Sequence, residues 1–281
     1  MKTGCLVLAM FIFQTVRAHP GIGIVQDRRG NIYYTDLKQV FRLDPAGKKT
    51  VAVPNVHTHE LYLDEQDNLF GEHLWYNNSQ NSWGYYVWKM KPGGQIEKVI
   101  PETTGFMTDY SFVRDRQGKM YWAERNDKCQ KIGRISPGQT REIIGDKCLH
   151  NIRWLKSTPK GEILIVDFQT ICKINERGHI ETLATNVADP RMTVSNSGNQ
   201  NSVMGVWDDP EGSLYVAVYS NRQVKKFSKE GTELQSIKIS FPWGPSGGLI
   251  DANGALWILE SDVVNRVRLE RVDRNGSRKV F

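Results

Sequence analysis

The chain has 281 residues, of which 39% are hydrophobic and 24% are charged, and its formal net charge is +6. The hydrophobic share is enough to fill a core, and no segment is low-complexity. The charges are scattered rather than gathered into a basic stripe, which argues against a dedicated nucleic-acid-binding protein.

The first eighteen residues differ in character from the rest of the chain. Lys2 is followed by an almost uncharged apolar run from Cys5 to Val16, and the small residue Ala18 ends the segment. This order is typical of a cleaved secretory signal peptide. The apolar run is also shorter than the roughly 20 residues that a membrane span needs. We therefore expect residues 1–18 to be removed, leaving a secreted or periplasmic protein without a transmembrane anchor.

The rest of the chain repeats one short phrase six times. The phrase is a turn, usually Asp-x-x-Gly, followed by a hydrophobic strand that often ends in an acid. The turn residues lie 37, 51, 43, 51 and 42 residues apart and are Gly30, Asp67, Gly118, Gly161, Gly212 and Gly254. Periods of about 40 to 50 residues with several short strands are typical of β-propeller blades. Residues 19–281 are therefore predicted to form one all-β domain, a six-bladed β-propeller with four antiparallel strands per blade.

This repeat resembles the NHL-repeat propellers and, more loosely, the SMP-30/gluconolactonase-like and strictosidine-synthase-like groups. The resemblance covers the mature chain. It implies that the first strand of each blade surrounds a central channel. It also implies that the loops before each first strand and after each second strand gather on one face, where ligands bind. Because these families include lactonases, lyases, hydrolases and plain binding modules, the resemblance predicts the fold and leaves the activity open.

Two alignment columns identify side chains expected at this face. The column eight residues before the turn residue contains Ile22, His59, Tyr110, Arg153, Met204 and Ser246. The column at the end of the second strand contains Asp36, His73, Glu124, Asp167, Val218 and Glu260. Strand-end carboxylates commonly accept backbone N–H groups from the following loop, and we expect this structural role for Asp36, Asp167 and Glu260. Glu124, which precedes a polar loop next to blade 2, is a candidate catalytic group.

Histidines gather in blade 2. His57 and His59 are two residues apart and share a face of an extended chain, and His73 ends the neighbouring strand. Three imidazoles beside Glu60 or Glu72 suit one divalent transition metal, and they predict a zinc-like rather than a calcium site. The alternative is that these histidines satisfy hydrogen bonds of the loops at the channel mouth. No Gly-rich phosphate loop is present in the sequence, so no nucleotide cofactor is predicted.

The column before the turn also contains Arg153. In the SMP-30-like enzymes this column supplies a glutamate, an asparagine and an aspartate to a metal, and this sequence does not reproduce that set. A guanidinium group there favours a carboxylate or phosphate of a ligand. The alternative is a structural ion pair of Arg153 with Glu60 or Asp109.

These patterns predict an enzyme that acts on a small, anionic or sugar-like molecule at the channel mouth. The expected reaction is metal-assisted hydrolysis or lyase chemistry. The predicted catalytic residues are His59, Tyr110, Glu124 and Arg153, and the predicted metal ligands are His57, His59 and His73. The alternative is a non-catalytic propeller module that binds a ligand or another protein.

Three cysteines remain after signal cleavage, and an exported compartment permits a disulfide. In the predicted propeller, Cys129 lies between the second and third strands of blade 3, and Cys148 lies just before blade 4. Both positions are on the same face, so we expect these two residues to be bonded. Cys172, on the inward side of a third strand, should be a buried thiol.

Overall fold

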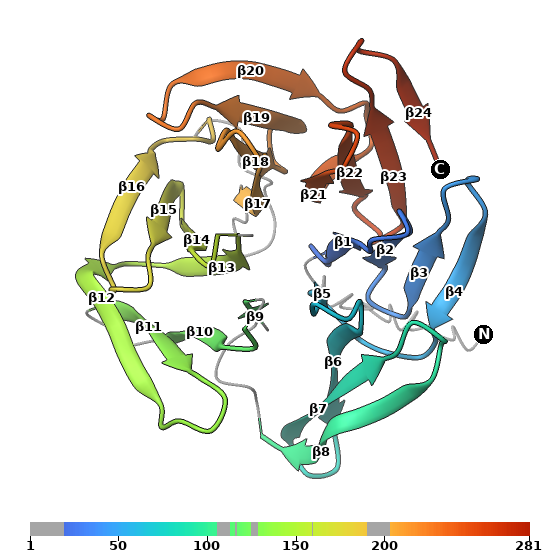
Figure 1. The fold of residues 1–281 in the computed structure, drawn as a ribbon, viewed down its shortest axis with the longest axis vertical. Coiled ribbons are helices and arrows are strands. Elements are labelled where there is room, and N and C mark those ends of the chain that lie inside the picture. Colours follow the sequence, from blue (N-terminus) through green and yellow to red (C-terminus); the bar gives the residue numbers. More distant parts are fainter. Residues whose placement is uncertain (1–19, 106–112, 116, 125–128, 159, 190–202) are drawn as a thin grey trace, which may run out of the picture.

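A computed structural model of the chain describes residues 20–105, 113–115, 117–124, 129–158, 160–189 and 203–281. Within these residues, 24 strands form six sheets, and each sheet consists of four antiparallel strands that are consecutive in the chain. The sheets surround a central axis as the blades of a ring (Figure 1). The prediction of an all-β six-bladed propeller is confirmed. Residues 1–18 and Tyr110 lie outside the described residues.

The strands occupy equivalent places in every blade. The innermost strands are β1 (Ile24–Gln26), β5 (Tyr62–Leu63), β9 (Val113–Arg114), β13 (Ile152–Ser157), β17 (Val203–Asp208) and β21 (Gly244–Ile250). The second strands are β2 (Ile32–Thr35), β6 (Leu69–Asn77), β10 (Met120–Glu124), β14 (Ile163–Asp167), β18 (Leu214–Val218) and β22 (Leu256–Ser261). The third strands are β3 (Val40–Leu43), β7 (Ser82–Met90), β11 (Gln130–Ile135), β15 (Thr170–Ile174), β19 (Gln223–Phe227) and β23 (Val267–Val272). The outermost strands are β4 (Lys49–Val53), β8 (Ile96–Thr104), β12 (Glu142–Leu149), β16 (Ile180–Ala184), β20 (Glu233–Lys238) and β24 (Arg278–Val280).

The repeated phrase is a turn that is held by its own first side chain. In blade 1, Oδ1 of Asp27 accepts the backbone N–H of Asn31 at 2.8 Å, and Oδ2 accepts the hydroxyl of Tyr33 at 3.3 Å. Gly30 closes the turn with a φ of 83°, a conformation that glycine adopts without steric cost. The same acceptor recurs in the other blades as Asp64, Asp115, Thr158, Asp209 and Asp251. The repeat period in the sequence is therefore the spacing of six turns that are held by the same side-chain-to-backbone hydrogen bond.

The ring closes by packing between its first and last blades. Blade 1 consists of β1–β4 and blade 6 of β21–β24, so no blade is shared between the two ends of the chain. Buried residues of both blades form one cluster, and its fully or nearly buried members are Ile24, Ile32, Tyr34, Leu43, Trp257, Leu259 and Leu269. The ring of Phe281, the last residue, stacks on Trp257 with centroids 5.4 Å apart.

The cysteines are placed as predicted. Cys129 and Cys148 form a disulfide across 19 residues of sequence, with their Cα atoms 5.1 Å apart. Cys172 is a buried thiol on β15. Among the described residues, no helix is long and apolar enough to cross a membrane.

Candidate functional site

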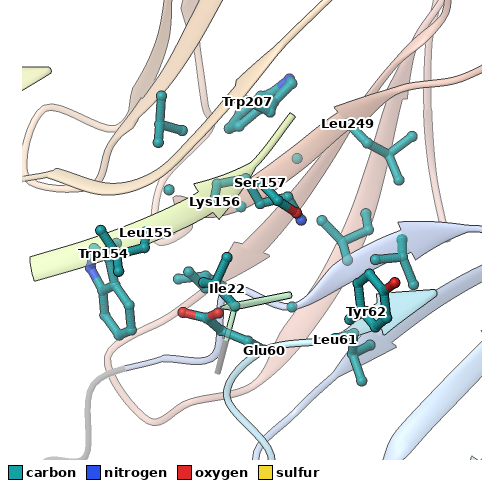
Figure 2. A pocket seen from close by; sticks show the side chains of 18 of the residues that line it. Ile22, Glu60, Leu61, Tyr62, Trp154, Leu155, Lys156, Ser157, Trp207 and Leu249 are labelled. Carbon is teal, nitrogen blue, oxygen red and sulfur yellow. The ribbon is translucent and has the colours of Figure 1, made fainter. Parts of the chain in front are cut away.

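The innermost strands enclose a cavity of about 300 Å³ along the ring axis (Figure 2). All six blades contribute to its wall, which we call the channel wall. It contains the residue five positions before each turn residue, and these are Val25, Tyr62, Val113, Lys156, Trp207 and Leu249. It also contains the residue seven positions before the turn, whose described members are Gly23, Glu60, Trp154, Gly205 and Gly247. The repeat therefore fixes which side chains reach the axis.

Ile22 lines the cavity at its predicted position, but in blades 2 and 4 the residue that faces the channel lies one position later than the sequence predicted. The wall contains Glu60 where His59 was expected, and Trp154 where Arg153 was expected. In blade 4 the pairing of β13 with β14 shifts register between Ile152 and Trp154, and such a bulge changes the direction of the residue that it leaves unpaired. Arg153 lies at this bulge and is half-buried. Its role in orienting an anionic ligand stays a prediction.

His57 and His59 come together with Glu72 beside the channel wall. Both histidines lie in the loop between β4 and β5, and Glu72 lies on β6. Nδ1 of His59 is 3.1 Å from Oε1 of Glu72, and Nε2 of His59 is 3.2 Å from Nε2 of His57. Glu72 and His59 are buried, whereas His57 is half-buried. The three groups form a line from an interior carboxyl group to an imidazole nearer the surface.

Burial determines the charges along this line. It lowers the pKa of His57 and of His59 to about 4, and it raises the pKa of Glu72 to about 7 against the opposing effect of backbone hydrogen bonds. Both imidazoles are therefore neutral at pH 7, and the contact of His59 with Glu72 is a hydrogen bond rather than an ion pair. Oε1 of Glu72 also accepts the backbone N–H of His59 at 2.5 Å, so it acts as the acceptor for the Nδ1 proton. This leaves the Nε2 lone pair of His59 directed at His57.

His73 has other partners. Its Nδ1 accepts the backbone N–H of His57 at 2.9 Å. Its ring stacks on Tyr86, with centroids 4.8 Å apart, and on Trp75, with centroids 5.7 Å apart. Burial lowers the pKa of His73. The structure thus brings together two of the three predicted metal ligands and gives the third a loop hydrogen bond, as the alternative interpretation supposed.

The donor atoms of the two histidines suit a transition metal better than calcium. Two imidazole nitrogens that share one tetrahedral zinc lie about 3.3 Å apart, and the Nε2 atoms of His57 and His59 are separated by 3.2 Å. A carboxyl group on the far nitrogen, as Glu72 provides for His59, commonly orients a metal-binding histidine. Calcium takes oxygen ligands, which these imidazoles do not offer. Within the described residues, however, no group of three or more His, Cys, Asp or Glu side chains is arranged to hold a metal, so a zinc-like ion stays a prediction.

Glu124, at the end of β10, is held by its own blade. Its Oε2 accepts the indole N–H of Trp122 at 2.9 Å and forms an ion pair with Arg141. The guanidinium of Arg141 in turn lies 5.1 Å from the centroid of the Trp122 ring. These contacts give Glu124 a structural function, and its catalytic role remains untested.

The other strand-end acids have different partners in different blades. Asp36 accepts the backbone N–H groups of Lys38 and Gln39, both at 2.9 Å, as predicted for a structural acid. Asp167 accepts backbone N–H groups from the loop that precedes its blade rather than from the loop that follows its strand. Glu260 pairs with a side chain instead, because Arg268 Nε lies 2.6 Å from its Oε2.

Lys156 belongs to the cavity but was not singled out from the sequence. A lysine on a short strand usually lies at the surface, so its residue type gives no signal. Its position does give one, because the column five residues before the turn is apolar or aromatic in the other five blades. A charged residue in a column that otherwise faces a channel is the pattern that would have identified it.

Comparison with known proteins finds relatives of the fold only. No protein-family model matches the chain, and no curated protein matches its sequence. Among solved structures, the virginiamycin B lyase of Staphylococcus aureus is 14% identical, with 93% of this chain and 84% of the lyase covered and a TM-score of 0.54. The calcium-binding protein regucalcin of Agrobacterium tumefaciens is 12% identical, covering 85% of this chain and 81% of that one, with a TM-score of 0.57. A gluconolactonase of Xanthomonas campestris is 14% identical, covering 84% and 82%, with a TM-score of 0.57.

At these identities the likeness shows a shared six-bladed propeller. The predicted resemblance to the SMP-30/gluconolactonase-like propellers is confirmed at the level of the fold.

Proposed function

We propose that this chain is an exported propeller enzyme that acts on a small molecule at the mouth of its central channel. The reaction is hydrolysis or elimination, and His57 is its general acid and base. The observation that carries this proposal is the line of Glu72, His59 and His57, with contacts of 3.1 and 3.2 Å. A buried carboxyl group that orients one imidazole behind a second proton-transfer group is an arrangement suited to acid–base catalysis.

The resting protonation states define the direction of proton transfer. Because His59 carries its proton on Nδ1, the Nε2–H of His57 donates to Nε2 of His59, and Nδ1 of His57 is free to accept a proton from water or substrate. The positive charge that then forms on His57 is stabilised through His59 by Glu72. A carboxyl group with a pKa of about 7 can take up part of that charge change near neutral pH.

His57 and His59 are the residues that would hold a divalent transition metal. Such an ion would supply Lewis-acid polarisation of a substrate oxygen. For this role His57 must move its proton from Nε2 to Nδ1, whereas His59 already presents a lone pair. Metal binding and direct acid–base catalysis therefore require different tautomers of His57, whereas His59 has the same tautomer in both.

The fold relatives support an enzyme as the first hypothesis. The staphylococcal lyase and the gluconolactonase have the same architecture. A histidine-to-alanine variant of that lyase is described as catalytically inactive in its structure with quinupristin. The alternative, a non-catalytic binding module, is equally compatible with this fold, so a turnover measurement must distinguish the two.

The test uses purified residues 19–281 with gluconolactone and quinupristin as substrates, in the presence and absence of added zinc. His57→Ala should lower turnover by at least about 100-fold, since removal of a general acid–base group costs about that much. His179→Ala is the matched control, because its imidazole is 62% exposed on the hairpin after β15, and it should retain activity. Elemental analysis of the same samples measures metal retention, and N-terminal sequencing of exported full-length protein tests cleavage after Ala18.

Three results would each contradict a different part of the proposal. Binding of either compound to the wild type without turnover, with and without zinc, supports the binding module instead. Turnover that is unchanged in His57→Ala removes the histidine line from the mechanism. A wild type that stays metal-free while turning over substrate leaves direct acid–base catalysis and ends the metal prediction.

A further inference from the structure

One charged side chain interrupts an otherwise uncharged ring of the channel wall. Five blades place Val25, Tyr62, Val113, Trp207 and Leu249 in the column five residues before the turn, and blade 4 places Lys156 there. Figure 2 shows Lys156 on its strand with Trp154, Trp207, Glu60 and Tyr62 around the same space. The histidine line makes no use of this lysine. Its presence at the axis needs a separate explanation.

No direct hydrogen bond or ion pair is found for the Nζ of Lys156 in the described part of the chain, and the charged groups that act on it are the carboxyl groups of Glu60 and Asp208. Burial lowers the pKa of Lys156, and the carboxyl groups of Glu60 and Asp208 oppose this effect without cancelling it. Asp208 is itself pushed toward its neutral form, because burial raises its pKa. An anion that entered the cavity would supply the compensation that these two groups leave incomplete.

The rest of the wall indicates what kind of anion fits. The rings of Tyr62, Trp154 and Trp207 provide apolar faces, and flat or aliphatic bodies pack well against such rings. Arg114 adds another cationic side chain to the wall. A volume of about 300 Å³ is at the lower end of small-molecule sites.

From this geometry we propose that the central cavity binds a small organic monocarboxylate, with the ammonium of Lys156 as its anchor and the aromatic wall around its apolar body. The proposal names the ligand class of the channel and in that sense rests on the proposed function. It assigns ligand recognition to Lys156 and leaves proton transfer to the histidine line. The two roles can therefore fail independently.

The experiment measures binding by calorimetry with benzoate as the probe and benzamide as its uncharged counterpart of similar shape. Wild type should bind benzoate at least tenfold more tightly than benzamide. Lys156→Met keeps the length of the side chain and removes its charge, and it should weaken benzoate binding at least tenfold while leaving benzamide binding unchanged. Lys229→Met is the matched control, because that side chain is 75% exposed, and it should bind as the wild type does.

Further variants separate ligand recognition from folding and from catalysis. Lys156→Arg restores a cation and should recover most of the benzoate binding, which a merely structural role of the lysine would not predict. If Lys156→Met does not fold, the preference of the wild type for benzoate over benzamide still decides the matter. His57→Ala should bind benzoate as tightly as the wild type does, because the proposal assigns binding to Lys156 and proton transfer to the histidines. Equal binding of benzoate and benzamide by the wild type, or full benzoate binding by folded Lys156→Met, would overturn the proposal.

Discussion

Single buried groups in this propeller have charge states that their residue types do not suggest. Glu72 has a pKa of about 7 because burial outweighs the backbone hydrogen bonds that it accepts. Next to it, His59 stays neutral because its imidazole is almost completely enclosed. The protonation states of these groups in blade 2 therefore depend on how deeply the folded ring buries them. The repeat sequence of the blade alone does not show this burial.

Glu260 shows the same effect in blade 6, away from the histidines. Its carboxyl group is fully buried, and burial raises its pKa, with a further increase from the neighbouring Glu270 and a partial offset from Arg268. Glu270 carries the negative charge of the pair, because the hydrogen bonds of Arg278, at 2.6 and 2.7 Å, lower its pKa in spite of its burial. The two carboxyl groups thus hold one proton at neutral pH.

Glu260→Gln should change how stability depends on pH. Above the ordinary carboxyl pKa the unfolded chain releases its proton while native Glu260 keeps one, so this group stabilises the fold less as the pH rises through its raised pKa. The glutamine variant does not titrate, and the stability advantage of the wild type over it should therefore shrink between pH 5 and pH 8. Urea denaturation at both pH values measures this difference. Glu211→Gln, at an exposed position, should show an offset that is the same at both.

The strands themselves were largely predictable from the sequence. In each blade the first and second strands are joined by a turn such as that of Asp27, whose side chain caps its own loop, and this chemistry is visible as Asp-x-x-Gly. Blade 2 has Asp67 in place of the glycine, and Asp67 adopts a φ of 58°, so the turn keeps its conformation with a different residue. The spacing of such turns predicts blade number and strand order without any knowledge of packing.

The exact direction of side chains was less predictable, for a physical reason. A strand alternates its side chains, so one unpaired residue reverses every later assignment. The bulge between Ile152 and Trp154 does this in blade 4, and it separates Arg153 from the channel wall. Partners far apart in sequence were also invisible, such as the pair of Glu124 and Arg141. Residue columns from a repeat are therefore reliable to about one residue until the pairing is known.

The disulfide should stabilise the junction of blades 3 and 4. Cys129 precedes β11 and Cys148 lies near the end of β12, so the bond encloses a loop of 19 residues. A loop of this length corresponds to about 3 kcal/mol in the chain-entropy model. The double variant with serine at both positions should lose about that much free energy of unfolding. Reductant should destabilise the wild type but leave the double variant unchanged.

A buried thiol provides the control for this prediction. Cys172→Ser removes the one free cysteine of residues 20–281 that the structure describes without touching the bond, so it should keep the full response to reductant. If the double variant still loses stability on reduction, the bond between Cys129 and Cys148 is not the source of the effect.

The ring as a whole distributes its stability over six layers of blades, and the layer between blades 6 and 1 differs from the others. At every other layer the chain itself continues from one blade to the next. Here no strand is shared, and the two ends of the chain are joined by packing between the blades and by a hydrogen bond from the backbone N–H of Ala252 to Gln26 Oε1. Phe281 contributes on both sides, because it stacks on Trp257 and lies against the turn of blade 1, where a Cβ on Gly47 would be 3.4 Å from its ring. This closure should be the first part of the ring to open.

Phe281→Ala should therefore destabilise the closure selectively. Loss of a half-buried phenylalanine ring should cost about 2 kcal/mol of unfolding free energy, less than the cost for a fully enclosed one. Hydrogen exchange should accelerate in blades 1 and 6 more than in blade 4, on the opposite side of the ring (Figure 1). Phe241→Ala is the matched control, because that side chain is 80% exposed and its removal should change stability by at most about 0.5 kcal/mol. Uniform acceleration in all blades would mean that the ring opens only by global unfolding and that its closure is as stable as its other layers.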